Sequence, residues 1–436
     1  MIQKKISVVT ATNLVVANMV GTGVFTSLGF QVAGISSDFA LIALWVVGGI
    51  LALCGALSYA ELATALPRSG GEYHYLSRIY HPSVGFLSGW ISVVVGFPAP
   101  IALAGIAFGG YFKIFAPGIS PVLLSLFVIW IITLVHLLGI RVEEMFQNGS
   151  TFLKIGLILV LIVAGLLIAN PQALSMIPGA KDLTVLVSPP FAVDLVYVMY
   201  AYSGWNAAAY ITEEVRNPAK NVPWALLIGT VAVTVLYLVL NYVFLLTTPR
   251  SVLSGQLEVG LLAGQAIFGP VGGKVVSLLI GVGLIATISA MAWIGPRITR
   301  RMAEDLPKLR LLGKTSTKGT PYAATILQVI IATILVTTGT FETVLFYTQF
   351  SLLLSSFLTV LGLIVLRIRE PKLERPYKVW GYPVIPLFFL AITLWMMLHV
   401  VLDRPTESLL GLITVIAGLI IYFFAREPGR TIHSRP

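Results

Sequence analysis

The sequence contains 436 residues, of which 57% are hydrophobic and only 11% are charged. A soluble chain carries roughly twice that charged fraction, so the composition predicts an integral membrane protein. The formal net charge is +10, but the cations lie between apolar segments and form no basic face, which argues against a nucleic-acid partner. The single cysteine, Cys54, lies in an apolar run, so a disulfide framework is excluded.

The apolar segments predict an all-α fold with twelve transmembrane helices in one domain, residues 1–436. A span needs roughly 20 mostly apolar residues. The expected spans are 7–34, 39–65, 83–112, 120–139, 149–169, 191–213, 224–247, 273–298, 322–340, 343–367, 382–402 and 408–425. We expect a short amphipathic piece at 252–269, in the loop between spans seven and eight.

The first span contains an interruption at Asn18–Phe25, where two glycines flank a threonine. Glycine weakens a helix, so the backbone is expected to unwind there. Unwound backbone is tolerated at membrane depth only where protein or a water-filled cavity satisfies it, so Gly21–Gly23 should face a cavity. The carbonyls of Asn18–Val20 end one half-helix and the N–H groups of Gly23–Phe25 begin the other, a pair of opposite partial charges that suits a zwitterion. The alternative is a small-residue packing site between helices.

A second interruption, Tyr202–Asn206, lies in the sixth span. Ser203 and Gly204 would free carbonyls near Tyr200–Ser203 that could complete an ammonium site. Trp205 could cover a ligand as a gate; the alternative is an aromatic anchor at the membrane interface. Its place about 14 residues into the span favours the gate. Paired interruptions in two halves of a chain point to the substrate site of a transporter.

The distribution of cations predicts the orientation. With the N-terminus in the cytoplasm, the inner loops hold 22 Lys and Arg residues and the outer loops hold five, as the positive-inside rule requires. Both termini are then cytoplasmic. Span six enters the membrane in the opposite direction to span one, so two five-helix units, approximately 7–170 and 191–368, are predicted to be inverted repeats, with helices 11 and 12 at 382–425 added.

One lysine, Lys154, lies inside span five, roughly 9 Å from its cytoplasmic start. An ionisable group within a span is a functional hypothesis, and the alternative is a side chain that snorkels to the surface. Signals for catalysis are weak: His74 and His81 have no clustered Cys or carboxylate, and no phosphate-binding loop is present. We therefore expect no catalytic residue, no metal and no cofactor, and an enzyme is not expected.

Four motifs carry a resemblance to a known family. They are Gly21–Phe25 in span one, Tyr59–Leu62 leading to Pro67–Tyr73, Ala201–Asn206 in span six, and Glu213–Pro218 after it. The sequence resembles the amino acid–polyamine–organocation superfamily and, within it, the L-type amino acid transporter branch. The span layout matches over the whole chain. It is most similar to bacterial exchangers of alanine, serine and cysteine.

The resemblance implies the fold of the bacterial leucine transporter, with helices 1 and 6 broken, and a site built on both breaks. It places the substrate carboxylate on the backbone of Gly21, Thr22 and Gly23. It places the amine on carbonyls near Met19, Val20, Tyr200, Ala201 and Ser203. Lys154 matches the family's span-five lysine, which ties span five to span one where related transporters bind sodium, and Ser289 is a neighbour in span eight.

The sequence departs from the family pattern at Ser203, where glycine is expected before Gly204. A hydroxymethyl group there would shrink the cavity and favour small substrates. Animal members attach a glycoprotein partner through a cysteine between spans three and four. Lys113–Ser120 has none, so no disulfide-linked heavy subunit is expected.

These observations favour a sodium-independent secondary transporter, an exchanger of small neutral L-amino acids that works by alternating access in the cell membrane. Its partners are the amino acid and the lipid bilayer. A rival is proton-coupled uptake of amino acids or amines, which the positions of Glu61, Glu213 and Asp194 near the span ends weaken. A rival of another class is a non-transporting receptor or chaperone subunit. The intact paired breaks and Lys154 argue against it.

Overall fold

The computed structural model describes residues 6–138, 143–168, 171–305, 307–316 and 319–425. Within these residues the chain is helical, apart from turns and an isolated bridge between Ile6 and Val215. The helices and short helical turns are α1 Val8–Met19, η1 Gly23–Phe25, α2 Ser27–Gly34, α3 Asp38–Ala65, α4 Gly71–Ile79, α5 Pro82–Ile91, η2 Ser92–Gly96, α6 Pro98–Phe112, α7 Pro121–Leu137, α8 Glu143–Leu166, α9 Ala180–Val185, α10 Pro189–Tyr202, η3 Ala207–Glu214, α11 Pro218–Thr247, α12 Arg250–Leu253, α13 Val259–Asp305, η4 Pro307–Gly313, α14 Tyr322–Thr338, α15 Phe341–Arg369, α16 Val384–Asp403 and α17 Pro405–Ala425.

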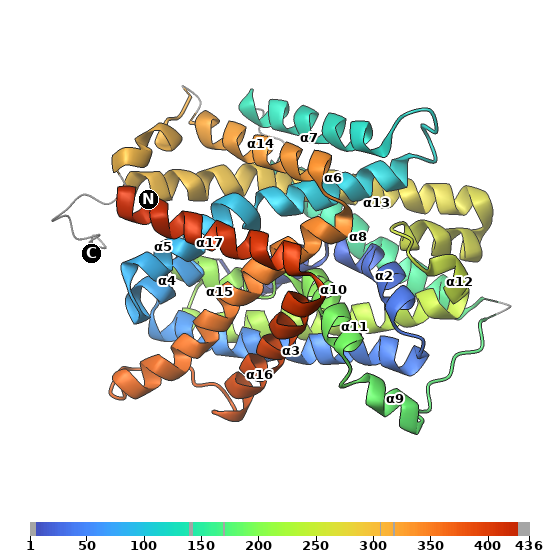
Figure 1. Cartoon of the computed structure of the whole chain (residues 1–436), viewed down its shortest axis with the longest axis horizontal. Helices are drawn as coiled ribbons and strands as arrows, with labels where there is room; N and C mark the ends of the chain where they lie inside the picture. Colours follow the sequence, from blue (N-terminus) through green and yellow to red (C-terminus); the bar gives the residue numbers. More distant parts are fainter. Residues whose placement is uncertain (1–5, 139–142, 169–170, 306, 317–318, 426–436) are drawn as a thin grey trace.

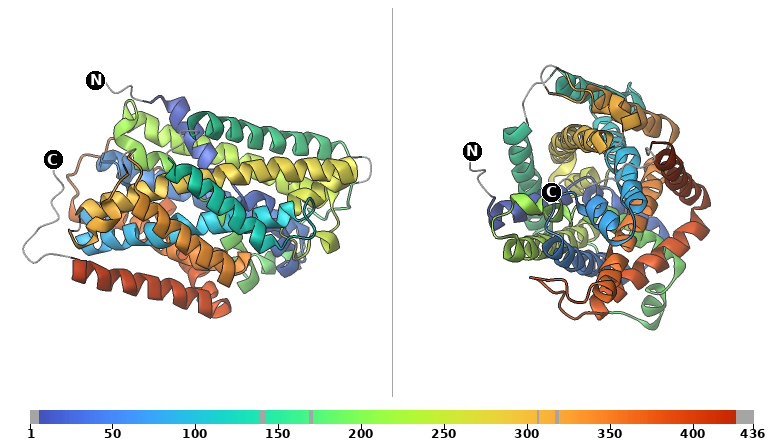
Figure 2. Two further views of the ribbon diagram at one scale, coloured as in Figure 1. Left: turned by 90° about the horizontal axis from the view of Figure 1, so that it is seen from above. Right: turned by 90° about the vertical axis from the view of Figure 1, so that its left-hand side faces the viewer.

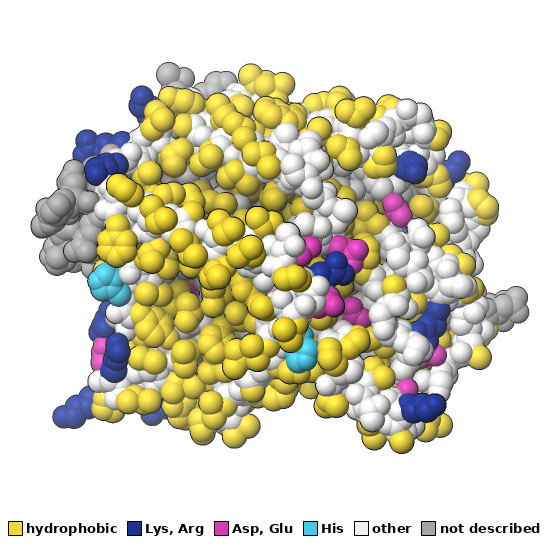
Figure 3. All heavy atoms as spheres, viewed as in Figure 1, with side chains coloured by type: hydrophobic (Ala, Val, Ile, Leu, Met, Phe, Trp, Pro, Cys, Tyr) yellow, Lys and Arg dark blue, Asp and Glu magenta, His cyan; other side chains and the backbone are white. Residues whose placement is uncertain are grey.

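Eight of the described helical stretches are long and apolar enough to cross a membrane, and α1, α7 and α14 are shorter apolar helices. Large hydrophobic side chains also face outward. On α7, for example, Leu123, Phe127 and Leu134 are 60%, 64% and 55% exposed. Figure 3 shows hydrophobic side chains over most of one face, with Lys and Arg mainly towards its two ends. Apolar surface on this scale suits lipid and not water, so the chain is a multi-pass membrane protein.

Most of the long helices run roughly along the long axis of the molecule, whereas α15 and α16 run obliquely to it (Figure 1). α3 packs beside α11, α11 beside α1, and α13 beside α6 and α8. α10 contacts α2, α3, α15 and α16, which brings segments distant in sequence around it. α1 begins and α17 ends at the same end of the molecule (Figure 2).

Both predicted interruptions are present. α1 ends at Met19 and helix resumes at Gly23, and α10 ends at Tyr202 before a 3₁₀ segment, η3. The third expected span, 83–112, lies within one helical stretch long enough to cross a membrane, Pro82–Phe112, in which Ser92–Gly96 forms a π-helical turn shortly before Pro98, which lacks an N–H group. The loop piece expected at 252–269 is instead α12 and the first part of α13, which bends at Gly269, where φ is +76°.

Seven cations used for the predicted orientation lie outside the described residues: Lys4, Lys5, Arg141, Lys318, Arg426, Arg430 and Arg435. Three of the described cations lie in the connection between α15 and α16: Lys372, Arg375 and Lys378.

Candidate functional site

The first break presents free backbone donors. Val20 leaves the helical conformation, with φ −75° and ψ +87°. Within the described part of the chain, the amide groups of Thr22 and Gly23 donate to no acceptor, whereas the Gly21 amide interacts with the Tyr237 hydroxyl oxygen. The first amides of a helix lack partners inside the helix, and such groups bind anions. This stretch can therefore hold a carboxylate without any cationic side chain.

Two carbonyls at the end of α1 accept hydrogen bonds from other helices. Tyr237 of α11 donates its hydroxyl to the Met19 oxygen at 2.7 Å, and the Lys154 Nζ donates to the Val20 oxygen at 2.6 Å. Each carbonyl oxygen has a second lone pair, so both can still accept from a ligand. Tyr237 was not singled out from the sequence, because a tyrosine in an apolar helix does not differ from a core residue.

The second break presents free acceptors. Gly204 has φ +103°, a conformation that L side chains rarely adopt and glycine adopts readily. The carbonyls of Ala201 and Tyr202 receive no hydrogen bond from the described residues. The Ser203 amide donates to the Tyr200 oxygen at 3.1 Å, and the Ser203 hydroxyl donates to the Met199 oxygen at 3.1 Å. The break thus keeps open carbonyls at the end of α10.

The two breaks lie against each other. A Cβ atom added at Gly23 would be 2.5 Å from the Ala201 Cα, and one added at Gly204 would be 2.8 Å from the Asn18 carbonyl carbon. Only glycine permits such close approach of two backbones. The structure therefore brings the free amides of the first break and the open carbonyls of the second break to one place.

Lys154 joins the first break to the rest of the protein. Its side chain is only 4% exposed, so the ammonium group lies at the Val20 carbonyl and not at the surface. A Cβ atom added at Gly283 of α13 would be 3.0 Å from the Lys154 stem, so that glycine makes room for it. Ser289 lies six residues further along α13, roughly 9 Å, with its Oγ 3.0 Å from the His136 Nε2.

Trp205 is 5% exposed and packs directly beyond the second break. Its ring makes edge-to-face contacts with Tyr59, at a centroid distance of 4.8 Å, and with Phe389, at 6.3 Å. A Cβ atom at Gly55 would be 2.8 Å from the indole. Trp205 is thus enclosed by α3 and α16 and is buried beside the break.

A buried carboxylate behind the second break was not singled out from the sequence. Glu72 of α4 is 6% exposed and accepts hydrogen bonds from Tyr59 at 2.5 Å, Ser355 at 3.4 Å and Asn206 at 3.5 Å. These donors are neutral. Burial raises the pKa of Glu72, although hydrogen bonds from Tyr59, Tyr210 and serine hydroxyls oppose the shift. Asn206, the residue after Trp205, therefore links this carboxyl group to the second break.

Aromatic rings cover the other side of the site. The Phe30 ring of α2 stacks on Tyr197 at 5.5 Å and on Phe341 at 5.7 Å. Phe341 also makes an edge contact with Tyr200. A cavity of about 360 Å³ adjoins Phe30 and Phe341.

The segment before α1 is held by backbone hydrogen bonds. The Ile6 amide donates to the Glu214 carbonyl oxygen, and the Arg216 amide donates to the Ile6 carbonyl oxygen. The start of α1 is therefore tied to the segment after η3.

Comparisons with known proteins find amino acid transporters and exchangers. b(0,+)-type amino acid transporter 1 of Mus musculus is 31% identical over 97% of this chain and 88% of that transporter. The serine/threonine exchanger SteT of Bacillus subtilis is 26% identical over 97% of both chains. Asc-type amino acid transporter 1 of Homo sapiens is 28% identical over 99% of this chain and 84% of its own. The family profile named amino acid permease matches residues 6–424, and the chain belongs to that family.

Proposed function

We propose that this permease exchanges small neutral L-amino acids across the cell membrane by alternating access, without sodium. The observation that carries the proposal is the contact between the two breaks, which joins free amides to open carbonyls. The substrate carboxylate binds the amides of Gly21, Thr22 and Gly23. Its ammonium group binds the open carbonyls near Tyr200–Ser203 and the remaining lone pair of the Met19 oxygen, and the Val20 oxygen is the acceptor for Lys154.

Small and neutral substrates are favoured by what lies beside the second break. Ser203 adds a hydroxymethyl group, and Trp205 limits the space beyond it. The cation nearest the first break, Lys154, already donates to Val20. A charged substrate side chain would therefore gain no partner among these residues, and desolvating it would be unfavourable. The Bacillus subtilis relative, a serine/threonine exchanger, supports substrates of this size.

Lys154 supports the proposed independence from sodium. A buried ammonium group at the Val20 carbonyl supplies the positive charge that an ion would otherwise supply. A second cation at the same place would be repelled. Ser289 belongs to the same proposal as a residue of α13, six residues after Gly283, which lies beside the Lys154 stem.

The architecture proposed with this function has twelve spans in one domain, 1–436. Inverted repeats cover approximately 7–170 and 191–368, and helices 11 and 12 follow at 382–425. Both termini are cytoplasmic, which is supported by α1 and α17 meeting the same end of the molecule (Figure 2). Cys54, the single cysteine, is 8% exposed within α3, which supports the absence of a disulfide-linked heavy subunit.

Glu72 favours a second candidate function, proton-coupled uptake. It is a buried carboxyl group with neutral donors and a link to the second break through Asn206. Because burial raises its pKa in the folded protein, the folded state binds this proton more tightly than the unfolded chain. Stability attributable to Glu72 therefore falls as the pH rises above the ordinary carboxyl range and is lowest above the raised pKa.

Transport into liposomes distinguishes the two functions. Uptake of radiolabelled alanine is expected to require internal amino acid and to be equal in sodium and choline. Glu72→Gln mimics the protonated carboxyl group, so exchange is expected to persist and the stability loss at rising pH to diminish, relative to Glu213→Gln at an exposed carboxylate. Uptake that needs no internal amino acid, follows a proton gradient and is lost in Glu72→Gln would replace exchange with proton coupling.

Trp205→Ala is expected to weaken alanine binding and to admit larger amino acids, because it removes the ring beside the second break. Truncating a buried aromatic residue typically destabilises a protein by about 3–5 kcal/mol, so affinity is to be compared at a temperature where both proteins are folded. Trp130→Ala, at a 45% exposed tryptophan of α7, is the control. Unchanged affinity and selectivity in Trp205→Ala would leave this ring a packing role only.

A further inference from the structure

A second cavity, of about 270 Å³, lies away from the breaks, between α3, α11 and the connection from α15 to α16. Ligand cavities in proteins begin at roughly 300 Å³, so this one suits a small group and not a whole amphiphile. Its walls come from the start of α11 and from residues 376–380 of the connection. None of the residues proposed to bind the amino acid lines it.

The cavity has a polar mouth and an apolar interior. Lys220, Trp224 and Leu227 line it from α11, and their spacing puts them on one face of the helix. Lys220 is exposed near the start of the helix, and Leu227 lies seven residues, roughly 10 Å, deeper. Leu57 adds apolar surface from α3. This gradient matches the headgroup and the first methylene groups of an amphiphile that lies along the membrane normal.

The cavity lies at the level expected for a membrane interface. Trp224 and Trp380 line it and are 44% and 56% exposed, and tryptophan is enriched where lipid headgroups meet the hydrocarbon. Lys372 and Lys378, on the connection, are exposed as well. In the orientation proposed above, this is the cytoplasmic leaflet, where anionic lipids attract basic segments.

A polar atom without a partner lies in the wall. The Tyr377 hydroxyl is buried and forms no hydrogen bond within the described part of the chain. Such a group is unfavourable unless a ligand or water satisfies it. The Tyr377 and Lys220 side chains both line the cavity.

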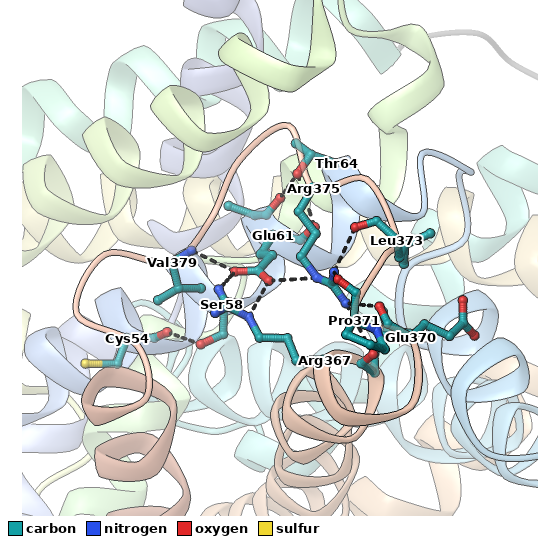
Figure 4. A network of polar contacts seen from close by, with 12 residues as sticks. Cys54, Ser58, Glu61, Thr64, Arg367, Glu370, Pro371, Leu373, Arg375 and Val379 are labelled. Carbon is teal, nitrogen blue, oxygen red and sulfur yellow. Dashed lines mark hydrogen bonds and ion pairs between the residues drawn. The ribbon is translucent and has the colours of Figure 1, made fainter.

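The wall formed by the connection is held in place from behind (Figure 4). The buried carboxylate of Glu61 accepts from Arg367 at 2.7 and 2.5 Å and from the Val379 amide at 2.7 Å. Arg375 adds an ion pair at 3.5 Å, and Arg367 lies over the Tyr382 ring at 3.7 Å. Residues 376–380 are therefore fixed against α3, and the cavity exists before a ligand binds.

We propose that this cavity binds the headgroup of an anionic phospholipid from the cytoplasmic leaflet. The phosphate accepts from Lys220, and the first part of an acyl chain lies along Trp224 and Leu227. Free phosphate shares the polar contacts but leaves the apolar interior empty. The bound lipid joins the start of α11 to the connection that Glu61 holds on α3.

Thermal unfolding of the purified, delipidated protein tests the proposal. Added phosphatidylglycerol is expected to raise the melting temperature, and phosphatidylcholine and glycerol 3-phosphate are expected to raise it much less. In Lys220→Glu, roughly tenfold more phosphatidylglycerol is expected for half of the effect, because a charge contact near the surface is reversed. Lys372→Glu makes the same charge change on the connection, outside the cavity, and is expected to match the wild type.

A second variant tests the volume and not the charge. Ala219 lines the cavity, so Ala219→Trp is expected to fill it and to abolish the selective effect of phosphatidylglycerol while alanine exchange continues. Equal losses in Lys220→Glu and Lys372→Glu would show general surface attraction and overturn the proposal. An equal effect of glycerol 3-phosphate would reduce the site to an anion site without lipid. Failure of alanine exchange in the wild type would contradict the proposed function and leave this test unaffected.

Discussion

Replacing Gly23 with valine is expected to abolish amino acid binding. A Cβ atom at this position would be 2.5 Å from the Ala201 Cα and 2.8 Å from its Cβ, so the two breaks would have to separate. Forcing extra atoms into a packed site costs about 1–3 kcal/mol, or roughly 5- to 150-fold in an equilibrium constant. The same separation would pull the amides of the first break away from the carbonyls of the second.

The measurement is the rise in melting temperature that alanine produces in purified protein. Gly21→Ala is the matched control, because a Cβ atom there would meet only the Met19 oxygen, at 3.9 Å. We expect Gly21→Ala to fold with the stability of the wild type and to keep the alanine-dependent rise in melting temperature. Gly23→Val is expected to show no such rise. If Gly23→Val kept the full rise at wild-type alanine concentrations, the substrate site would have to lie elsewhere.

Replacing Lys154 with alanine is expected to slow exchange strongly while substrate binding persists. The change removes the hydrogen bond from the ammonium group to the Val20 oxygen, which ties α8 to the end of α1. Hydrogen bonds to charged groups contribute about 1.5–3 kcal/mol, so a transport step that depends on this contact would slow by roughly 10- to 150-fold. Lys113→Ala, at an exposed lysine beyond α6, is the control.

Exchange in sodium, potassium and choline, with and without a proton gradient from pH 5 to 8, is the accompanying measurement. The wild type is expected to work equally in all three salts. Wild-type turnover in Lys154→Ala would mean that the tether has no part in transport. A steep dependence on the proton gradient that disappears in Lys154→Ala would favour symport over exchange.

The sequence by itself determined the class, the family and the positions of both breaks. The length of each apolar segment and its lack of charged residues can be read from the segment alone, and they identify a membrane protein. The resemblance to the amino acid–polyamine–organocation superfamily is confirmed by the family match over residues 6–424. The breaks at Gly21–Gly23 and Ser203–Gly204 could also be predicted from the local sequence. Glycine has a low helix propensity in any context. In the structure, α1 and α10 both end at these glycine-containing segments.

Only the tertiary structure decided which groups meet. Lys154 was recognisable as a charge within a span, but its acceptor, the Val20 oxygen, lies 134 residues earlier. Glu72 meets Ser355, and Glu61 meets Arg367, across 283 and 306 residues. Ser289 was placed on the helix that contacts Lys154, yet Gly283 is the residue beside the lysine stem. Helix propensity is set within a few residues, whereas a side chain's partners depend on how distant helices rotate and slide as they pack.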